Sequence, residues 1–252
     1  MMEKQTIGNA TLYRGDALEV LRQLEPNSCD ALVTDPPYSS GGLHIGTRQQ
    51  QPSLKYVSTG TTAAHNVDFH GDNRDSRSWT FWSMLWLSLA NPLIRPGGYA
   101  MMFTDWRQLP ASSDAFQGGG FTWRGIVPWD KTLSSRAPHT GYFRHQCEYV
   151  LWGSRGPLPK CTHGGPWPGM FSHRVIPSEK WHMTGKPIGL MTDLISPIGP
   201  GKIILDPFMG SASTGVATLQ SGGEFVGIES SVSIFDTACA RLEQVQASLS
   251  HG

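Results

Sequence analysis

The sequence predicts an α/β fold: a mostly parallel, twisted sheet with helices on both of its faces. Short apolar runs typical of buried strands alternate along the chain with segments that have the apolar spacing of helices. Several strand-like runs end directly in Asp, Glu, Gly or Pro, which is where open α/β sheets place their ligand sites. The 252 residues suffice for one such domain with a full hydrophobic core, so we expect a single domain over 1–252.

The first half of the chain predicts two helices and two strands. Apolar spacing favours helices over 18–24 and 79–93, and short apolar runs favour buried strands over 30–34 and 99–103. Pro36 and Pro37 end the first of these strands, and the Arg-Pro-Gly-Gly segment 95–98 predicts a turn before the second. The stretch 39–77 is rich in Gly, Ser, Thr, Gln and His and too long for an ordinary connection, so we expect a mobile functional loop there.

The second half continues the alternation. The pattern favours strands over 125–128, 148–152, 202–205 and 224–228, and helices over 188–195, 213–221 and 233–249. The stretch 153–180 is dense in Gly, Pro, His and Trp, and we expect a small irregular insertion there. Trp82 and Trp86 share one face of the 79–93 helix, and we interpret them as core residues rather than as a platform for stacking bases.

Composition limits the class of protein. Apolar residues make up 38% and charged residues 16%, which is ordinary for a globular protein, and no apolar run is long enough to cross a membrane. The first residues carry Glu3 and Lys4 and lack the apolar core of a signal peptide, so we expect a cytoplasmic location. The four cysteines include no C-x-x-C pair and the histidines show no ligand spacing, so we expect neither a disulfide framework nor a metal site.

The formal net charge is zero, but the charge is unevenly distributed. Segment 121–187 contains nine basic and three acidic residues, so the rest of the chain is acidic by the same excess. Such a basic segment is able to follow the phosphates of a nucleic acid. A solvated surface with a chance charge bias explains the segment equally well, so charge alone leaves both interpretations open.

The segment Asp35-Pro36-Pro37-Tyr38, at the end of a predicted strand, has the groups needed to methylate an aromatic amine. The lone pair of such a nitrogen is delocalised into its ring, which makes the nitrogen a poor nucleophile. The Asp35 carboxylate and the Pro36 carbonyl can accept its two hydrogens and turn the lone pair toward a methyl donor, and proline keeps the backbone rigid. Tyr38 offers a flat face for a base that has left the duplex. The same residues suit a plain strand-to-loop turn, which the tetrapeptide alone does not exclude.

A second segment, 206–215, follows another predicted strand and has the sequence Asp-Pro-Phe-Met-Gly-Ser-Ala-Ser-Thr-Gly. Its glycines suit a strand-to-helix turn where a cofactor approaches the backbone closely. A phosphate loop is excluded because Val216 follows Gly215 where lysine is required, and Ala212 replaces the second glycine of a dinucleotide site. Glu229 ends the next predicted strand, in a Val-Gly-Ile-Glu segment, at a spacing that suits a carboxylate binding ribose hydroxyls.

Together these motifs resemble the amino-methyltransferases of DNA, whose signatures are D-P-P-Y, D-P-F-x-G-S-x-S-T and V-G-I-E. The order, with D-P-P-Y before the cofactor motif, is similar to that of the β class. The Gly-Asp-Ala-Leu segment 15–18 resembles the family's segment near the cofactor adenine, and 182–187 resembles its H-x-T-x-K-P segment. The resemblance spans nearly the whole chain. It implies a Rossmann-like fold of the S-adenosylmethionine-dependent methyltransferases, with a target-recognition insertion at about 153–180.

The resemblance also assigns residues by role. The implied catalytic residues are Asp35, Pro36, Pro37 and Tyr38. The implied cofactor-binding residues are Asp16, Ala17, Asp35, His182, Thr184, Lys186, Asp206, Pro207, Phe208, Gly210, Ser211, Ser213, Thr214, Glu229 and Ser230. Within this set, we expect Glu229 to hold the ribose hydroxyls of S-adenosyl-L-methionine. The implied reaction is a direct in-line methyl transfer to a base flipped out of double-stranded DNA, without a covalent enzyme intermediate.

The chain departs from the family pattern in two places. The family usually has Gly-Ser-Gly-Thr where residues 210–213 are Gly-Ser-Ala-Ser, and an alanine there costs little unless the backbone φ must be positive. The 153–180 segment is short for a target-recognition part, so recognition is expected to involve the 39–77 loop or a partner subunit as well. Many β-class relatives pair, which implies a homodimer. The absence of a nuclease motif leaves room for a separate restriction endonuclease as a partner.

The first residue of the D-P-P-Y motif bears on the target base. Aspartate resembles the N6-adenine enzymes, whereas N4-cytosine enzymes more often carry serine, and a carboxylate accepts an N–H more strongly than a hydroxyl does. The sequence therefore favours N6-adenine, with N4-cytosine as the alternative. An RNA base as substrate and a non-catalytic DNA-binding relative also stay open, although the intact motif at Asp35 argues against the latter. A C5-cytosine enzyme is excluded because the chain has no Pro-Cys pair.

Overall fold

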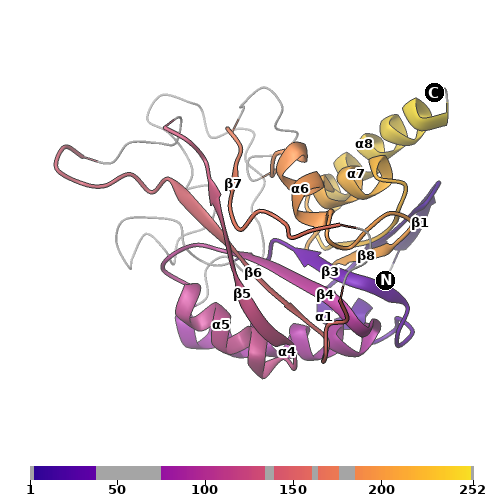
Figure 1. Cartoon of the computed structure of the whole chain (residues 1–252). Helices are drawn as coiled ribbons and strands as arrows, with labels where there is room; N and C mark the ends of the chain where they lie inside the picture. The colour runs from indigo at the N-terminus through magenta and orange to yellow at the C-terminus, as the bar shows by residue number, and fades with distance from the viewer. Residues whose placement is uncertain (1–2, 38–74, 134–138, 161–163, 176–184, 251–252) are drawn as a thin grey trace.

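The computed structural model describes residues 3–37, 75–133, 139–160, 164–175 and 185–250. These residues form one nine-stranded sheet with helices packed on both faces (Figure 1). The strands lie in the order β1-β2-β9-β8-β3-β4-β6-β5-β7. Their bounds are Glu3–Ile7 (β1), Ala10–Arg14 (β2), Cys29–Thr34 (β3), Ile94–Thr104 (β4), Thr122–Asp130 (β5), Cys147–Ser154 (β6), Phe171–Ser172 (β7), Ile203–Asp206 (β8) and Glu224–Glu229 (β9).

The centre of the sheet is parallel, as the sequence predicts. Strands β2, β9, β8, β3 and β4 run in one direction, and each pairs with the next. The edges include antiparallel pairs, because β1 is antiparallel to β2 and β6 is antiparallel to both β4 and β5. Five neighbouring strands therefore have their carboxyl ends on the same side of the molecule. Open α/β sheets bind their ligands at these strand ends.

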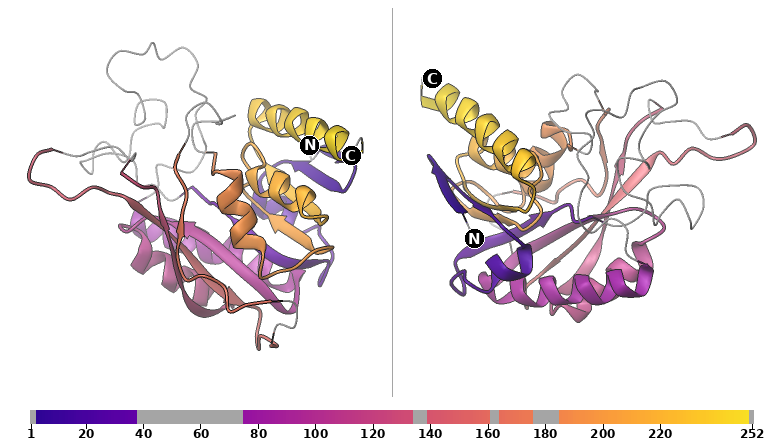
Figure 2. Two further views of the ribbon diagram at one scale, coloured as in Figure 1. Left: turned by 45° about the horizontal axis from the view of Figure 1, so that its top comes forward. Right: turned by 180° about the vertical axis from the view of Figure 1, so that it is seen from behind.

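Two helical layers cover the sheet (Figures 1 and 2). The helices are α1 (Ala17–Leu21), α4 (Ser76–Ala90), the 3-10 turn η2 (Asn91–Leu93), α5 (Leu109–Gly118), α6 (Ile188–Ile195), α7 (Ser213–Gln220) and α8 (Val232–Ser250). On one face, α1, α4 and α5 bury Trp79 and Trp86 against Leu32 of β3. On the other face, α6 and α7 cover Ala31 and Val33, the neighbours of Leu32 in the same strand. Successive residues of β3 thus alternate between two buried faces, which explains why its sequence is apolar throughout.

Four described elements were not predicted from the sequence. Strands β1 and β2 form an antiparallel pair at one sheet edge, and their sequences contain several polar residues that obscure an apolar pattern. Helix α5 contains two serines, an aspartate and a proline, so its own helix propensity is low. Its formation depends on packing, since Ala115 and Phe116 are completely buried against α4 and the sheet. Strand β7 is only two residues long.

The turn predicted over 95–98 is wrong, because these residues lie within β4. The pairing with β3 shifts between Cys29–Ile94 and Ala31–Tyr99, so β4 carries extra residues at this point. Gly97, with a φ of 80°, donates its N–H to the Arg155 carbonyl, and Gly98 accepts from the Arg155 N–H. The prolines and glycines therefore form an irregular, bulged start of the strand rather than a break before it.

Helix α4 begins earlier than its apolar pattern suggests. The Asp75 carboxylate caps the helix by accepting hydrogen bonds from the backbone N–H groups of Arg77 and Ser78 at 3.0 and 3.1 Å. Residues 75–77, predicted as the end of the long loop, thus belong to the helix start, and the rest of the predicted 39–77 loop lies outside the described residues. The helix ends at Ala90 rather than continuing to Leu93, because the short 3-10 turn Asn91–Leu93 follows and its Pro92 has no N–H to continue the helix.

The predicted insertion over 153–180 is described only in part. Gly153 and Ser154 still belong to β6, which continues beyond the predicted end, and Phe171–Ser172 adds the short strand β7 beside β5. Residues 161–163 and 176–180 lie outside the described residues. No described helix is both long and apolar enough to cross a membrane.

Candidate active site at the carboxyl ends of the parallel strands

Three predicted motifs meet at the carboxyl edge of the sheet. Asp35 follows β3, Asp206 ends β8 and Glu229 ends β9, and these strands are neighbours in the order β9-β8-β3. Gly15 and Asp16 follow β2, which pairs with β9. Segments up to about 200 residues apart in the sequence are therefore brought to one edge by the parallel topology.

The buried carboxylate of Asp206 joins two of these motifs. Its Oδ1 accepts hydrogen bonds from the Thr34 hydroxyl at 2.7 Å and from the Phe208 N–H at 3.1 Å. Its Oδ2 accepts a hydrogen bond from the Thr214 hydroxyl at 2.7 Å. Burial raises the pKa of Asp206 to about 6, although these hydrogen bonds oppose the rise, and the charge of Asp35 adds to it. Asp206 thus connects the end of β3 to the segment that starts α7.

The Asp35 carboxylate is paired with Lys186. Lys186 Nζ lies 2.5 Å from Asp35 Oδ2 and 3.4 Å from Glu148 Oε2 in β6. The other oxygen of Glu148 lies 3.0 Å from Nζ of Lys131, which directly follows β5. The ring centroid of Phe103 in β4 lies 5.0 Å from Lys186 Nζ. The sequence predicted Lys186 beside the cofactor, and the structure places its ammonium against the carboxylate predicted to be catalytic.

The pKa values of this cluster are shifted by burial and by mutual attraction. Burial alone would lower the pKa of Lys186, but the charges of Asp35 and Glu148 outweigh it and raise that pKa above its usual value. Burial alone would raise the pKa of Glu148, but Lys186 and Lys131 hold it below its usual value. Lys186 and Glu148 are therefore both charged at neutral pH. Glu148 and Lys131 were not predicted as site residues, since only their spatial proximity to the Asp35–Lys186 pair distinguishes them.

Trp79 of α4 supports the loop that follows Asp35. Its indole Nε1 donates a hydrogen bond to the Pro37 carbonyl at 2.6 Å, and its side chain is completely buried. Only Trp82 and Trp86 of this helix were interpreted as core residues from the sequence, and nothing in the apolar spacing indicates a bond from Trp79 to a distant loop. Tyr38, the next residue of the predicted catalytic motif, lies outside the described residues.

Phe208 anchors the second motif to the same helical layer. Its ring centroid lies 5.3 Å from that of Trp82 and 5.1 Å from that of Trp86. Trp86 is fully buried, and Trp82 packs partly buried against the same cluster, which agrees with their prediction as core residues. Phe208 therefore packs on tryptophans that belong to the core, and this packing fixes the start of the 206–215 segment.

The backbone of this segment has an unusual conformation at Ala212. Gly210 and Ala212 have φ values of 51° and 60°, in the left-handed region. An L-residue other than glycine costs about 1–2 kcal/mol there, so the alanine in place of the family's usual glycine is strained. On α8, Arg241 donates to the Ser211 carbonyl at 2.9 Å and lies 3.3 Å from the hydroxyls of Ser211 and Ser213. Buried hydrogen bonds from Arg241 thus hold the strained turn in place.

Glu229, the last residue of β9, contacts other parts of the proposed cofactor site. Its Oε1 accepts a hydrogen bond from the Ser231 N–H at 2.7 Å, and its backbone carbonyl accepts one from the Gly15 N–H at 3.0 Å. Burial raises the pKa of Glu229, although backbone hydrogen bonds, including one from Gly210, oppose the rise. Asp16 caps α1, with its Oδ1 accepting from the N–H groups of residues 18 and 19. The predicted residues Gly15, Asp16, Gly210 and Glu229 therefore surround one strand end.

Of the remaining predicted site residues, some lie within the described part of the chain and others do not. Pro207, Ala17 and Ser230 lie next to Asp206, Asp16 and Glu229 in the chain. His182 and Thr184 lie outside the described residues.

Some charges of the basic 121–187 segment have structural partners far from Asp35. Arg155 donates to the Asn27 side chain and to the carbonyls of Pro92 and Ile94. Arg124 donates to the Ser154 hydroxyl at 2.8 Å. Ser154 pairs with the early part of β4, so these two arginines lie at the sheet edge opposite to Asp35. The charge excess of the segment therefore overstates the positive charge available beside the site.

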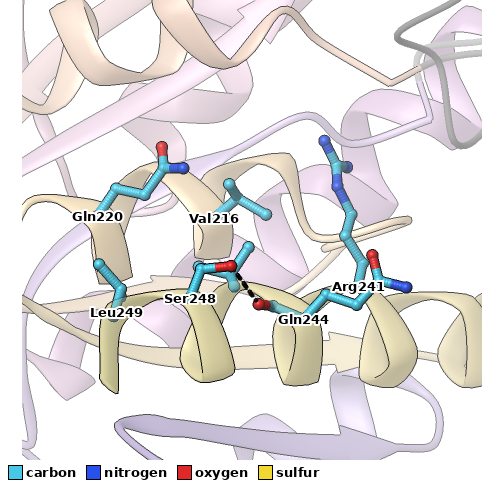
Figure 3. A pocket seen from close by; sticks show the side chains of 7 residues that line it. Val216, Gln220, Arg241, Gln244, Ser248 and Leu249 are labelled. Carbon is cyan, nitrogen blue, oxygen red and sulfur yellow. Dashed lines mark hydrogen bonds between the residues drawn. The ribbon is translucent and has the colours of Figure 1, made fainter. Parts of the chain in front are cut away.

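A groove of about 310 Å³ lies between α7 and α8 (Figure 3). Val216 and Gln220 of α7 line one side, and residues 241–249 of α8 line the other. Arg241 lies at one end of this groove and Leu249 at the other. None of its lining residues was predicted to bind a cofactor, although Arg241 also donates to the Ser211 carbonyl in the 206–215 segment.

Comparison with known proteins connects this geometry to a family. Residues 29–239 match a family model described as N6 and N4 DNA methylase. The YubD protein of Escherichia coli (strain K12) is 30% identical over 240 residues, covering 95% of this chain and 92% of that protein. The type II methyltransferase M2.LlaDCHI of Lactococcus lactis subsp. cremoris is 26% identical over 257 residues, covering 94% of this chain and 90% of that protein.

Solved structures share the fold. The crystal structure of an M1.HpyAVI–SAM complex has a TM-score of 0.66 and 23% identity, covering 92% of this chain and 98% of that chain. The PvuII DNA methyltransferase, titled cytosine-N4-specific, has a TM-score of 0.69 and 15% identity, covering 98% of this chain and 94% of that chain. At these identities the likeness concerns the fold, and the fold includes an enzyme that modifies cytosine.

Proposed function

The chain belongs to the family of N6 and N4 DNA methylases, and from this membership we propose that it transfers a methyl group from S-adenosylmethionine to N6 of adenine in double-stranded DNA. The observation that carries the proposal is the place of Asp35. Its carboxylate follows β3, next to β8 with Asp206, and β9 with Glu229 lies one strand further. A carboxylate there can accept a hydrogen of the target amine within reach of a methyl donor bound over β8 and β9.

The residues around β8 and β9 suit S-adenosylmethionine. Glu229 provides a carboxylate at a strand end, the acceptor that two ribose hydroxyls require. A side chain at Gly210 would meet no atom within 4 Å, so the surroundings of this left-handed residue leave space for a ligand. When bound, the cofactor supplies an electrophilic methyl group on a positively charged sulfur. Asp16, Ser211 and Ser230 complete the proposed contacts, and His182 and Thr184 are assigned to the site on sequence grounds alone.

Asp35 and Pro36 carry the proposed mechanism. The Asp35 carboxylate accepts one N–H of the adenine amine and the Pro36 carbonyl accepts the other, which turns the nitrogen lone pair toward the methyl group. As the N–C bond forms and the S–C bond of the donor breaks, positive charge develops on this nitrogen and the nearby carboxylate stabilises it, and the methylated nitrogen then releases one proton to solvent. The Trp79 indole bond to the Pro37 carbonyl keeps this short loop in one conformation. Tyr38 is assigned the face on which the flipped base stacks, on sequence grounds alone.

The proposed DNA-facing surface is the same edge of the sheet. The end of β5 and the start of β6 pair beside the end of β4, and residues 139–146 before β6 project beyond the rest of the described structure (Figure 1). These residues include Arg144 together with the exposed aromatic side chains of Tyr142 and Phe143. A positive charge and exposed rings on a loop that leaves the sheet at the carboxyl end of β5 suit contacts to phosphates and bases.

Adenine is the proposed target because Asp35, and not serine, occupies the first position of the motif. A carboxylate is a stronger acceptor of an amine hydrogen than a hydroxyl group. The fold does not decide between the bases. We also propose duplex DNA and a second copy of the chain as partners. The type II name of a relative suggests a role beside a separate restriction endonuclease.

The test is incubation of the purified protein with tritium-labelled S-adenosylmethionine and mixed-sequence duplex DNA, followed by mass spectrometry of the nucleosides. We expect N6-methyladenine. N4-methylcytosine would keep the mechanism and overturn the target base. Label in RNA but not in DNA would overturn the substrate, and no transfer with intact cofactor binding would indicate a binding role.

A matched pair of variants tests the role of Asp35 in the same assay. Asp35→Ala removes the carboxylate and should abolish turnover while cofactor binding remains measurable. Asp114→Asn changes an exposed carboxylate on α5 and should leave turnover unchanged. Retained methylation by Asp35→Ala would contradict the role that we propose for this residue.

A further inference from the structure

Four charged side chains form a continuous chain that ends at Asp35. In order they are Lys131, Glu148, Lys186 and Asp35, with successive charged atoms 3.0, 3.4 and 2.5 Å apart. They come from three different strands or their ends, β5, β6 and β3, and from the segment before α6. The Lys186 side chain is only 9% exposed and that of Glu148 18%. Interactions between charges are stronger at such depth than at the surface.

The pairing of Lys186 with Asp35 creates a problem for the proposed chemistry. The amine nitrogen becomes positively charged during methyl transfer, so the site needs the negative charge of Asp35. An ammonium at 2.5 Å neutralises much of that charge and competes with the amine for the same carboxylate. Glu148 offers Lys186 a second carboxylate at 3.4 Å, and so draws part of the ammonium's charge away from Asp35.

We propose that Glu148 is a positioning residue for the methyl-transfer site, acting on Asp35 through Lys186 and itself held by Lys131. This inference rests on the proposed function and adds to it residues outside the D-P-P-Y motif. Glu148 keeps Lys186 oriented between two carboxylates, so that Asp35 is held in place without losing its charge. Lys131, 3.0 Å from the other Glu148 oxygen, limits how strongly Glu148 draws on Lys186.

The first test is the kinetics of Glu148→Gln with DNA. This variant removes the carboxylate charge that competes with Asp35 for Lys186, so we expect kcat to fall by about tenfold or more, while KM for S-adenosylmethionine changes less than about twofold. Glu148→Asp keeps the charge and should restore most of the lost kcat. A merely structural role would instead lower the amount of folded enzyme without this separation of kcat from KM.

The second test measures the pKa of Lys186 directly and does not depend on activity. Lysine labelled with ¹³C at Cε is followed by NMR against pH, and Lys186→Met identifies the signal. Glu148→Gln removes a nearby negative charge and should lower the pKa of Lys186, whereas Lys131→Met removes the positive charge that competes with Lys186 for Glu148 and should raise the pKa of Lys186. Lys202→Met is the control, because Lys202 lies beside Asp30 at the opposite ends of the strands, and it should leave the pKa of Lys186 unchanged.

The outcomes separate this inference from the proposed function. If the wild type methylates DNA but Glu148→Gln keeps its kcat and the Lys186 pKa, the inference is wrong and the function stands. If the wild type modifies no nucleic acid, the methyl-transfer role falls with the function. The opposite shifts in the pKa of Lys186, down in Glu148→Gln and up in Lys131→Met, would then still show whether Glu148 controls Lys186. If Glu148→Gln does not fold, Glu148→Asp and Lys131→Met decide the same question.

Discussion

The Thr34 hydroxyl donates a 2.7 Å hydrogen bond to Asp206 Oδ1, and this bond joins the two motifs that define the site. Thr34 is the last residue of β3 and directly precedes Asp35, whereas Asp206 ends β8. Both side chains are buried, with Thr34 completely inaccessible and Asp206 only 2% exposed. The proposed catalytic loop and the proposed cofactor loop are therefore connected through one carboxylate whose protonation depends on pH.

The first prediction concerns the pH dependence of stability contributed by Asp206. Its pKa is raised from 3.8 to about 6 in the folded protein, so the folded state binds the proton more tightly than the unfolded state. The resulting stabilisation is fully present below pH 3.8 and is lost as the pH rises through about 6. It amounts to about 3 kcal/mol, since one pKa unit corresponds to about 1.4 kcal/mol.

Urea unfolding of the wild type and of Asp206→Asn measures this contribution. The asparagine does not titrate, so the free energy of unfolding of the wild type minus that of the variant should fall between about pH 4 and about pH 7. Other carboxylates titrate in both proteins and cancel in this difference. A difference that stays constant over this range would show that Asp206 has an ordinary pKa.

The second prediction compares two buried tryptophans of α4. Trp79→Phe removes the donor to the Pro37 carbonyl, and we expect kcat for methyl transfer to fall by about tenfold because the proposed catalytic loop loses its support. Trp86→Phe is the matched control. Trp86 is equally buried, but its indole N–H has no hydrogen-bond partner among the described residues, and phenylalanine keeps a ring against Phe208.

Both tryptophan variants should lose stability, because each removes buried ring atoms, typically about 1–3 kcal/mol for such a change. The decisive measurement is kcat at saturating DNA and cofactor, corrected for the folded fraction. Equal kcat values for the two variants would contradict a role of the Trp79–Pro37 bond beyond packing.

The order of the motifs and the alternation of strands and helices were enough to predict the parallel centre of the sheet. Buried strands such as β3 are apolar on both faces, and a short turn sequence such as Asp35-Pro36-Pro37 marks where one ends. The antiparallel pair β1–β2 at one edge of the sheet could not be predicted in the same way. Their pairing partners are set by distant parts of the chain, and β1 has only one well-buried residue, Ile7.

The site was predictable wherever a motif is contiguous in the sequence. Asp35, Asp206 and Glu229 each stand at the end of a predicted strand, and topology then brings them together. Contacts such as those of Glu148 and Trp79 depend on three-dimensional packing between elements that carry no shared pattern. The strain at Ala212 was also hidden, because its cost depends on a φ of 60° that the residue type does not reveal.

The third prediction concerns cofactor affinity at Glu229. Glu229→Gln removes the negative charge that the ribose hydroxyls are proposed to bind, and the dissociation constant for S-adenosylmethionine should rise by about tenfold or more. Glu224→Gln is the control, since Glu224 lies exposed at the opposite end of the same strand. Isothermal titration calorimetry gives both constants. Unchanged affinity in Glu229→Gln would remove this residue from the proposed cofactor site.

The last prediction concerns Arg241, which supports the proposed cofactor loop from α8. Arg241→Met keeps much of the buried aliphatic volume but loses the hydrogen bonds to Ser211 and Ser213. Without these hydrogen bonds, fewer interactions offset the strain of the left-handed turn at Ala212, so the loop should open more often. We expect faster amide hydrogen exchange in residues 210–213 and a several-fold weaker affinity for S-adenosylmethionine.

Gln244→Met provides the control for Arg241, because Gln244 lines the same groove between α7 and α8 from an exposed position (Figure 3). It should change neither hydrogen exchange at 210–213 nor cofactor affinity. If Arg241→Met weakens binding while exchange stays slow, Arg241 acts on the cofactor by another route than the loop. If both stay as in the wild type, the backbone bond from the Ala212 N–H to the Met209 carbonyl at 2.8 Å, together with Asp206, is sufficient to hold the turn.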